Sequence, residues 1–232
     1  MGQWTVQSAT ALAPWAKISA RGPQSLEFLQ GQLSQDLSAV KDDGMWTLLL
    51  EPDSAVISSA LVRQIEDGFS LTLSQGLAEV SLRRLSRFLL RVKCVLERED
   101  DTAGPVATVG ELVTKGWPGE NEFRANLVPQ AFGNHFVEST VSFSKGCFTG
   151  QELVGRLDAR GSSVPWRLVR VEGESPEEMD SLLRSKGPSG PQGLTSVIER
   201  ESGFEALGIA HRSLLGLDGL AGSGATVVSA IT

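Results

Sequence analysis

The stretch Lys145-Gly-Cys-Phe-Thr-Gly-Gln-Glu152 carries the most information about the fold of this chain. Thr149 stands three residues before Glu152, which is the spacing of a capping box at the start of a helix. The spacing therefore predicts a helix that starts near Thr149 and runs toward Ala159. Glu152 and Arg156 are four residues apart, so they can pair on one face of that helix.

The cysteine of this stretch precedes the predicted helix. A helix N-terminus and a neighbouring lysine both favour thiolate over thiol, and Cys147 would have both close by. Gly146 and Gly150 allow the backbone to approach a ligand or to take a positive φ. We therefore predict a glycine-flanked thiol beside the cation of Lys145 and exposed amide donors. The alternative is an ordinary glycine-rich turn with a small buried cysteine.

The whole octapeptide, with an arginine downstream, resembles the signature of the folate-binding YgfZ family, which is related to the glycine-cleavage T-protein (aminomethyltransferase). Phe148 stands where that family often has Tyr. A second stretch, from Gly22 to Leu37, resembles the opening pattern of the same family, but has Gln24 in place of Asp and Ser34 in place of Thr. The resemblance extends over most of the chain and implies tetrahydrofolate binding and a role in iron–sulfur protein maturation and tRNA modification.

The resemblance also implies site residues. It makes Cys147 the catalytic residue. The implied cofactor-binding residues are Trp15, Gln30, Gln32, Lys145, Gly146, Phe148, Gln151, Glu152 and Arg156. Trp15 would stack on the flat pterin ring, and its alternative role is to fill the core of a strand.

The fold class implied is α+β, with two domains. Residues 1–162 would form a T-protein-like folate-binding α/β domain, in which one α/β lobe is missing near 97–107, and residues 163–232 a small antiparallel β-barrel. Runs of apolar residues and turn signals predict the following elements. Strands are expected over 13–19, 45–51, 55–65, 69–74, 91–97, 166–171, 194–200, 204–211 and 225–230, and helices over 23–31, 34–40, 76–90, 108–115 and 176–183.

Composition narrows the classes of partner. The net charge of −7 argues against a broad nucleic-acid surface, so no direct nucleic-acid contact is expected. The basic run Arg83, Arg84, Arg87, Arg91 and Lys93 fits a solvated helix face. No apolar stretch is long enough to span a membrane, and the start of the chain does not resemble a signal peptide. Two cysteines, Cys94 and Cys147, give no disulfide framework, which favours a reducing cytoplasm.

Three functions remain open. The first is a folate-linked factor that assists iron–sulfur client or assembly proteins, in which the chain itself holds no metal, because two cysteines and two histidines do not make a cluster or zinc site. The second is a one-carbon transferase. Against this, Ser58 and Ser59 occupy positions where the T-protein resemblance implies acidic residues, so aminomethyl transfer is not favoured. The third is a binding module without chemistry that uses the cleft between domains for a protein or tRNA. Separately, a homo-oligomer would close the cleft left open by the missing lobe. A pairing of His135 with Cys147 is a further alternative.

Overall fold

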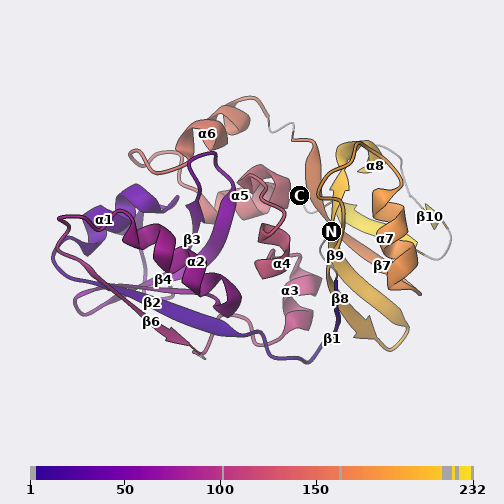
Figure 1. Ribbon diagram of the computed structural model, residues 1–232, viewed down its shortest axis with the longest axis horizontal. Helices are drawn as coiled ribbons and strands as arrows, with labels where there is room; N and C mark the ends of the chain where they lie inside the picture. The colour runs from indigo at the N-terminus through magenta and orange to yellow at the C-terminus, as the bar shows by residue number, and fades with distance from the viewer. Residues whose placement is uncertain (1–3, 101, 162–163, 216–220, 223–224, 231–232) are drawn as a thin grey trace. The chain divides into compact units, whose positions relative to one another are not determined.

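The computed structural model describes residues 4–100, 102–161, 164–215, 221–222 and 225–230 (Figure 1). Residue contacts divide the chain into two compact units. Unit 1 comprises residues 1–12, 106–136 and 157–232, and unit 2 comprises residues 13–105 and 137–156. The units are interleaved in sequence, so their limits differ from the predicted domain boundary after residue 162. The predicted division into two domains at that point stays a prediction.

Unit 2 is built on a five-stranded antiparallel sheet. Across the sheet, the strands are β3 (Met45–Leu50), β4 (Val56–Ile65), β5 (Gly68–Ser74), β2 (Trp15–Arg21) and β6 (Val95–Asp100). The helices α1 (Ser25–Gln32) and α2 (Gln75–Ser86) pack on these strands, and the short 3-10 helix η1 (Leu37–Ala39) follows α1. The β4–β5 hairpin is confirmed. A Cβ at Gly68 would lie 2.0 Å from the carbonyl oxygen of Ala20, so this turn needs glycine.

Unit 1 contains a six-stranded sheet whose order is β1-β8-β9-β7-β11-β10. The bounds are β1 (Val6–Ser8), β7 (Trp166–Gly173), β8 (Gly193–Arg200), β9 (Gly203–His211), β10 (Ala221–Gly222) and β11 (Ala225–Ala230). β1 pairs with β8 in parallel, and the other pairs are antiparallel. Mixed α and β structure is therefore confirmed. The small barrel is not, because over the described residues this sheet is open.

Short helices accompany the sheet of unit 1. They are α3 (Val109–Lys115), α4 (Glu120–Phe123), η2 (Pro129–Phe132), α7 (Pro176–Arg184) and α8 (Arg212–Leu215). α7 covers a core that includes Met179, Leu183 and Val197. Two further helices complete the chain: it enters unit 2 within α5 (Asn134–Thr140) and leaves unit 2 within α6 (Gln151–Ala159). None of the described helices combines the length and apolar character that a membrane crossing requires.

The region after α2 differs from its prediction. α2 ends at Ser86 rather than Leu90, because the chain then forms tight turns and Arg91 takes a φ of +64°. The strand expected from residue 91 begins at Val95. Arg84, expected on a solvated face, is 3% exposed. Its position explains this, since Leu77, Ser81, Arg84 and Leu85 follow the spacing of one helical stripe. The helix α4 lies where the sequence patterns predicted no helix.

Candidate functional site

The octapeptide forms a loop and the first turn of α6 within unit 2. The predicted helix is confirmed, with its start at Gln151, two residues later than Thr149. The amide of Thr149 donates to the carbonyl oxygen of Gly31 over 3.1 Å, and its hydroxyl lies 3.5 Å from the same oxygen. Glu152 accepts from Arg156 Nη2 at 2.6 Å. A capping box was expected between Thr149 and Glu152. In the structure, Thr149 instead joins the loop to α1, and Glu152 pairs with Arg156.

Lys145 is directed at the C-terminal end of α1. Its Nζ donates to the carbonyl oxygens of Gln30 at 2.7 Å, Leu33 at 2.7 Å and Gln35 at 2.9 Å. The last carbonyls of a helix lack partners within it, and a cation near them is favoured. Lys145 therefore caps α1 and joins the two stretches that carry the family resemblance.

Burial changes the acidity of this lysine. The removal of water around Nζ lowers the pKa of Lys145 to about 8, and the nearby carboxylate of Asp36 acts in the opposite direction. Nζ also lies 5.3 Å from the ring centroid of Phe148, which is 7% exposed. Phe148 is consequently part of the packing beneath the loop.

Gln30 and Gln32, in the stretch from Gly22 to Leu37, also have internal partners. Gln30 Nε2 donates to Asp36 Oδ1 at 2.6 Å, and Gln30 Oε1 accepts from the amide of Leu37 at 2.9 Å. Hydrogen bonds from Ser38 and then Gln30 lower the pKa of Asp36. Together these bonds hold the turn that carries the oxygens around Lys145.

Gln32 accepts from the buried guanidinium of Arg84 at 3.3 Å. Arg84 also donates to the carbonyl oxygen of Leu50 at 3.3 Å, lies 3.4 Å from a carboxylate oxygen of Glu51, and sits 4.5 Å above the ring of Phe88. Desolvation lowers the pKa of Arg84, against the attraction of Glu51. Sequence reasoning missed this arginine, although its place on the buried stripe of α2 is a signal for it.

Cys147 is exposed, whereas Cys94 is buried. Burial raises the pKa of the Cys94 thiol. A Cβ at Gly146 would meet no atom within 4 Å, so the backbone next to Cys147 is open to an incoming molecule. Gly150 differs: its φ is +82°, and a Cβ there would lie 2.7 Å from the carbonyl oxygen of Glu51.

The two glycines give a matched pair of substitutions. Gly150→Ala should lower the free energy of unfolding by about 2–3 kcal/mol, because alanine combines a strained φ with a backbone clash. Gly146→Ala should change it by less than about 0.5 kcal/mol. Urea denaturation of both variants measures these values. Equal effects of the two substitutions would contradict this account of the loop.

The remaining predicted residues lie in different surroundings. Trp15 is 5% exposed, and Gly104 packs so closely on its indole that a Cβ would lie 2.1 Å away. Its stacking on a pterin stays a prediction, and would require the segment around Gly104 to move. Ser58 and Ser59 are buried in β4, and the hydroxyl of Ser58 lies 2.9 Å from that of Ser81. His135 belongs to unit 1, whereas Cys147 belongs to unit 2.

Comparison with solved structures identifies the class of fold. The chain is similar to the glycine cleavage system aminomethyltransferase T from Bartonella henselae, with a TM-score of 0.57 and 13% sequence identity over 95% of this chain and 86% of that one. The fold is therefore that of the aminomethyltransferase T class.

Sequence comparison finds similar proteins within this class. The chain is similar to the tRNA-modifying protein YgfZ of Klebsiella pneumoniae (strain 342), with 21% identity over 247 aligned positions and 76% of each chain covered. The YgfZ of Enterobacter sp. (strain 638) is also 21% identical, over 249 positions with 76% of each chain covered. That of Pectobacterium atrosepticum is 22% identical over 223 positions, with 66% of this chain and 67% of the relative covered. No family model matches. In sequence and fold, the chain is thus distantly similar to the YgfZ/aminomethyltransferase T-like family.

Proposed function

We propose that this protein is a YgfZ-like, folate-linked factor that assists the assembly or repair of iron–sulfur proteins and thereby tRNA modification. Cys147 is its reacting group. The observation that carries the proposal is an exposed thiol on a loop that Lys145 and Thr149 fix to α1 from the inside. Such a loop presents its sulfur without needing to rearrange. The role in tRNA modification is proposed only because the chain is similar to relatives named for it.

The thiol chemistry is that of a single ligand or nucleophile. Iron–sulfur clusters usually have four protein ligands, most often thiolates. Of the two cysteines in the chain, Cys94 is buried and Cys147 exposed. In the proposed role, Cys147 supplies one ligand during transfer or repair, and the client or assembly protein supplies the others. A reducing cytoplasm, as predicted, suits an exposed thiol of this kind.

Folate is the proposed small-molecule partner. A cavity of about 260 Å³ lies beside α1 in unit 2. Its lining is Gln24, Glu27, Phe28, Gly31, Gln32, Phe88 and Val92. Amide and carboxylate groups suit the N–H and carbonyl edge of a pterin, and a ring suits its face. The donor set therefore fits the pterin end, while the volume is below that of most whole-ligand sites. When bound, tetrahydrofolate supplies a carrier for one-carbon units.

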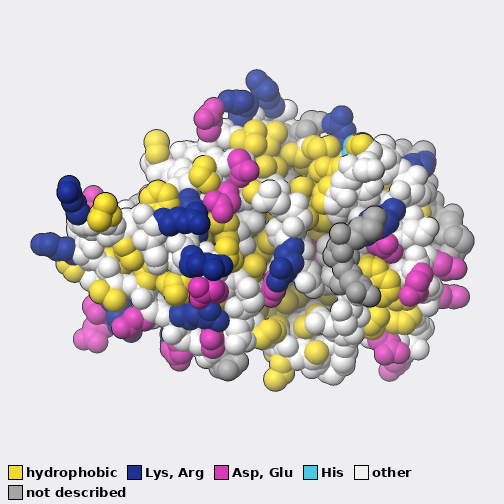
Figure 2. Space-filling model, in the orientation of Figure 1, with side chains coloured by type: hydrophobic (Ala, Val, Ile, Leu, Met, Phe, Trp, Pro, Cys, Tyr) yellow, Lys and Arg dark blue, Asp and Glu magenta, His cyan; other side chains and the backbone are white. Residues whose placement is uncertain are grey.

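Other proposals are less favoured by the site. The serines at 58 and 59 carry no carboxylate, which argues against aminomethyl transfer. On the face shown in Figure 2, Lys and Arg side chains are interspersed with Asp and Glu.

Tetrahydrofolate titration tests the cofactor. We expect saturable quenching of tryptophan fluorescence in the purified protein, and a Kd about 10-fold weaker in Glu27→Gln, because one charged hydrogen bond is lost. Glu27 is exposed, so this substitution should leave the fold intact. Glu138→Gln, also exposed and in unit 2, is the matched control. Quenching that does not saturate, or that both variants retain equally, would reject folate at this cavity.

A further inference from the structure

A larger cavity, of about 470 Å³, lies within unit 1. Its polar walls come from two places in the sequence. α4 and the residue that follows it contribute Asn121 and Arg124, and the end of α7, with the segment that leads into β8 and the start of β8 itself, contributes Arg184, Gln192 and Thr195. Trp4 adds an apolar wall, and packs against the hydrophobic core of this unit. None of these residues belongs to the candidate site around Cys147.

Arg184 is held rigidly in this cavity. Its Nε donates to Asp180 Oδ2 at 2.6 Å, and Asp180 Oδ1 accepts from the amide of Leu194 at 2.8 Å. Gly193 is required for this arrangement, because its φ is +133° and a Cβ there would lie 2.1 Å from Arg184 Nη2. Among the described residues, no acceptor is within hydrogen-bonding distance of Nη1 or Nη2 of Arg184. The two terminal amino groups form a preorganised fork of donors.

The other walls supply groups of complementary type. Asn121 is exposed, and its Nδ2 donates to Ser196 Oγ at 3.3 Å. Gln192 is 8% exposed and donates to the carbonyl oxygen of Pro188, and its own Oε1 lacks a donor among the described residues. A buried acceptor without a donor on the wall of a cavity is uncommon and needs an explanation.

Charge alone does not make this an anion site. Arg124 pairs with Glu120, and Arg184 with Asp180, so each cation has an acid on its own helix. Recognition therefore depends on geometry. The planar guanidinium fork matches the two oxygens of a carboxylate or phosphate, and a side chain already fixed by its neighbours loses little freedom when it binds.

We propose that this cavity of unit 1 binds a small molecule with a carboxylate or phosphate group on a flat apolar body. The oxyanion lies on the fork of Arg184, with Arg124 opposite, and the flat body lies along Trp4. The volume falls in the range of small-molecule sites. This site is independent of the proposed function of Cys147.

Three probes of similar shape test the site on the full chain: benzoate, phenyl phosphate and the uncharged benzyl alcohol. We expect saturable amide shifts at Gly193 and Leu194 in NMR titrations with at least one of the two anions, at a Kd below about 10 mM, and none with benzyl alcohol. The preferred anion tells a carboxylate ligand from a phosphate ligand. Arg184→Gln should weaken that binding at least 10-fold, because two charged hydrogen bonds are lost.

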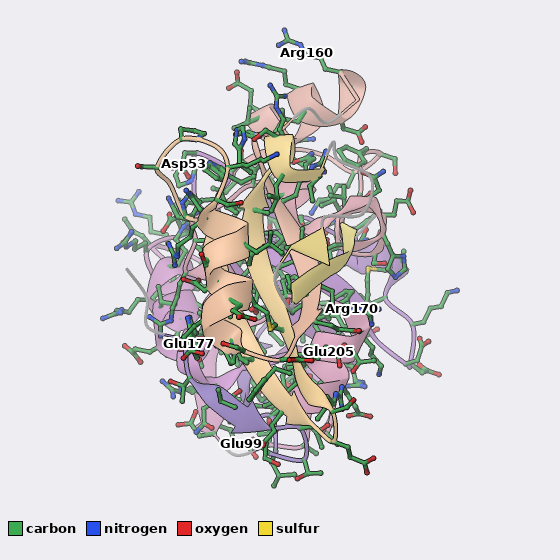
Figure 3. All side chains as sticks on the ribbon, turned by 90° about the vertical axis from the view of Figure 1, so that its right-hand side faces the viewer. Asp53, Glu99, Arg160, Arg170, Glu177 and Glu205 are labelled. Atoms are coloured by element: carbon green, nitrogen blue, oxygen red, sulfur yellow. The ribbon has the colours of Figure 1, made fainter. Side chains whose placement is uncertain are left out.

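Two other variants complete the test. Arg124→Gln should also weaken binding, and it gives the answer if Arg184→Gln does not fold, since the side chain of Arg124 is 66% exposed. Arg160→Gln is the matched control, because Arg160 follows α6 and projects into solvent (Figure 3). The proposal is overturned if neither anion binds, if benzyl alcohol binds as well as the anions, or if the folded Arg184 or Arg124 variants bind like the unchanged protein.

Discussion

Replacing Cys147 by serine is expected to abolish the rescue of iron–sulfur enzyme activity in a strain that lacks this protein. Serine keeps the size and the hydrogen-bonding ability of the side chain, but an alcohol neither ligates iron as a thiolate does nor matches its nucleophilicity at neutral pH. Because Cys147 is exposed, the free energy of unfolding should change by less than about 0.5 kcal/mol. Enzyme activity in the complemented strain and urea denaturation of the purified variant give the two readings.

Cys94→Ser provides the matched control. Cys94 is buried, so a hydroxyl there should cost about 1–2 kcal/mol of stability, and rescue should persist. Full rescue by Cys147→Ser would remove the thiol from the mechanism and favour a binding module that works without chemistry. Loss of rescue in both variants would point to stability rather than to the reacting sulfur.

Replacing Lys145 by methionine is expected to have the largest effect on stability. Methionine fills a similar volume but leaves the carbonyl oxygens of Gln30, Leu33 and Gln35 without their donor. Partly buried acceptors that lose a charged donor should cost about 2–4 kcal/mol in total, since water can reach some of them. This corresponds to a fall in Tm of about 5–12 °C for a chain of this size.

Amide hydrogen exchange should localise the effect of Lys145→Met. The amide of Ser34 donates to the carbonyl oxygen of Leu48, and that of Thr149 to the carbonyl oxygen of Gly31. Protection of these two amides should fall before that of the amides within the sheet. Lys41→Met, at an exposed position, is the control and should leave Tm unchanged. A Lys145→Met variant as stable as the unchanged protein would show that the carbonyl oxygens are satisfied by other donors.

The difference in the free energy of unfolding between the unchanged protein and Lys145→Met should depend on pH, because the pKa of Lys145 is about 8. An unfolded lysine titrates near 10.4, so between these values the unfolded chain binds more protons than the folded chain. The contribution of Lys145 to the free energy of unfolding should therefore rise with pH over this window. The rise should be on the order of 1 kcal/mol, because the side chain is only partly buried and solvent screens the effect. Urea denaturation of the unchanged protein and Lys145→Met from pH 7 to about pH 10 measures it. A stability difference that narrows with rising pH would contradict this sign.

Local sequence patterns predicted the strands β2 to β5 of unit 2 and the helix α6 well. The hairpin at Gly68, the apolar run of β4 and the helix after Gly150 all depend on neighbours within a few residues, which a sequence displays directly. The same reasoning placed Arg84 in solvent, because a guanidinium is usually exposed. Its burial depends on Gln32, Leu50 and Glu51, which are distant in sequence.

What the sequence determined by itself was the family resemblance of the chain, the place of Cys147 in the motif and the helix that follows it. These follow from residue types at fixed spacing. Only the tertiary structure decided what Lys145 does, because its oxygen partners lie more than 100 residues earlier in the chain. It also decided that Gly146 is open while Gly150 is confined, since the free space around a Cβ is set by packing and not by the residue itself.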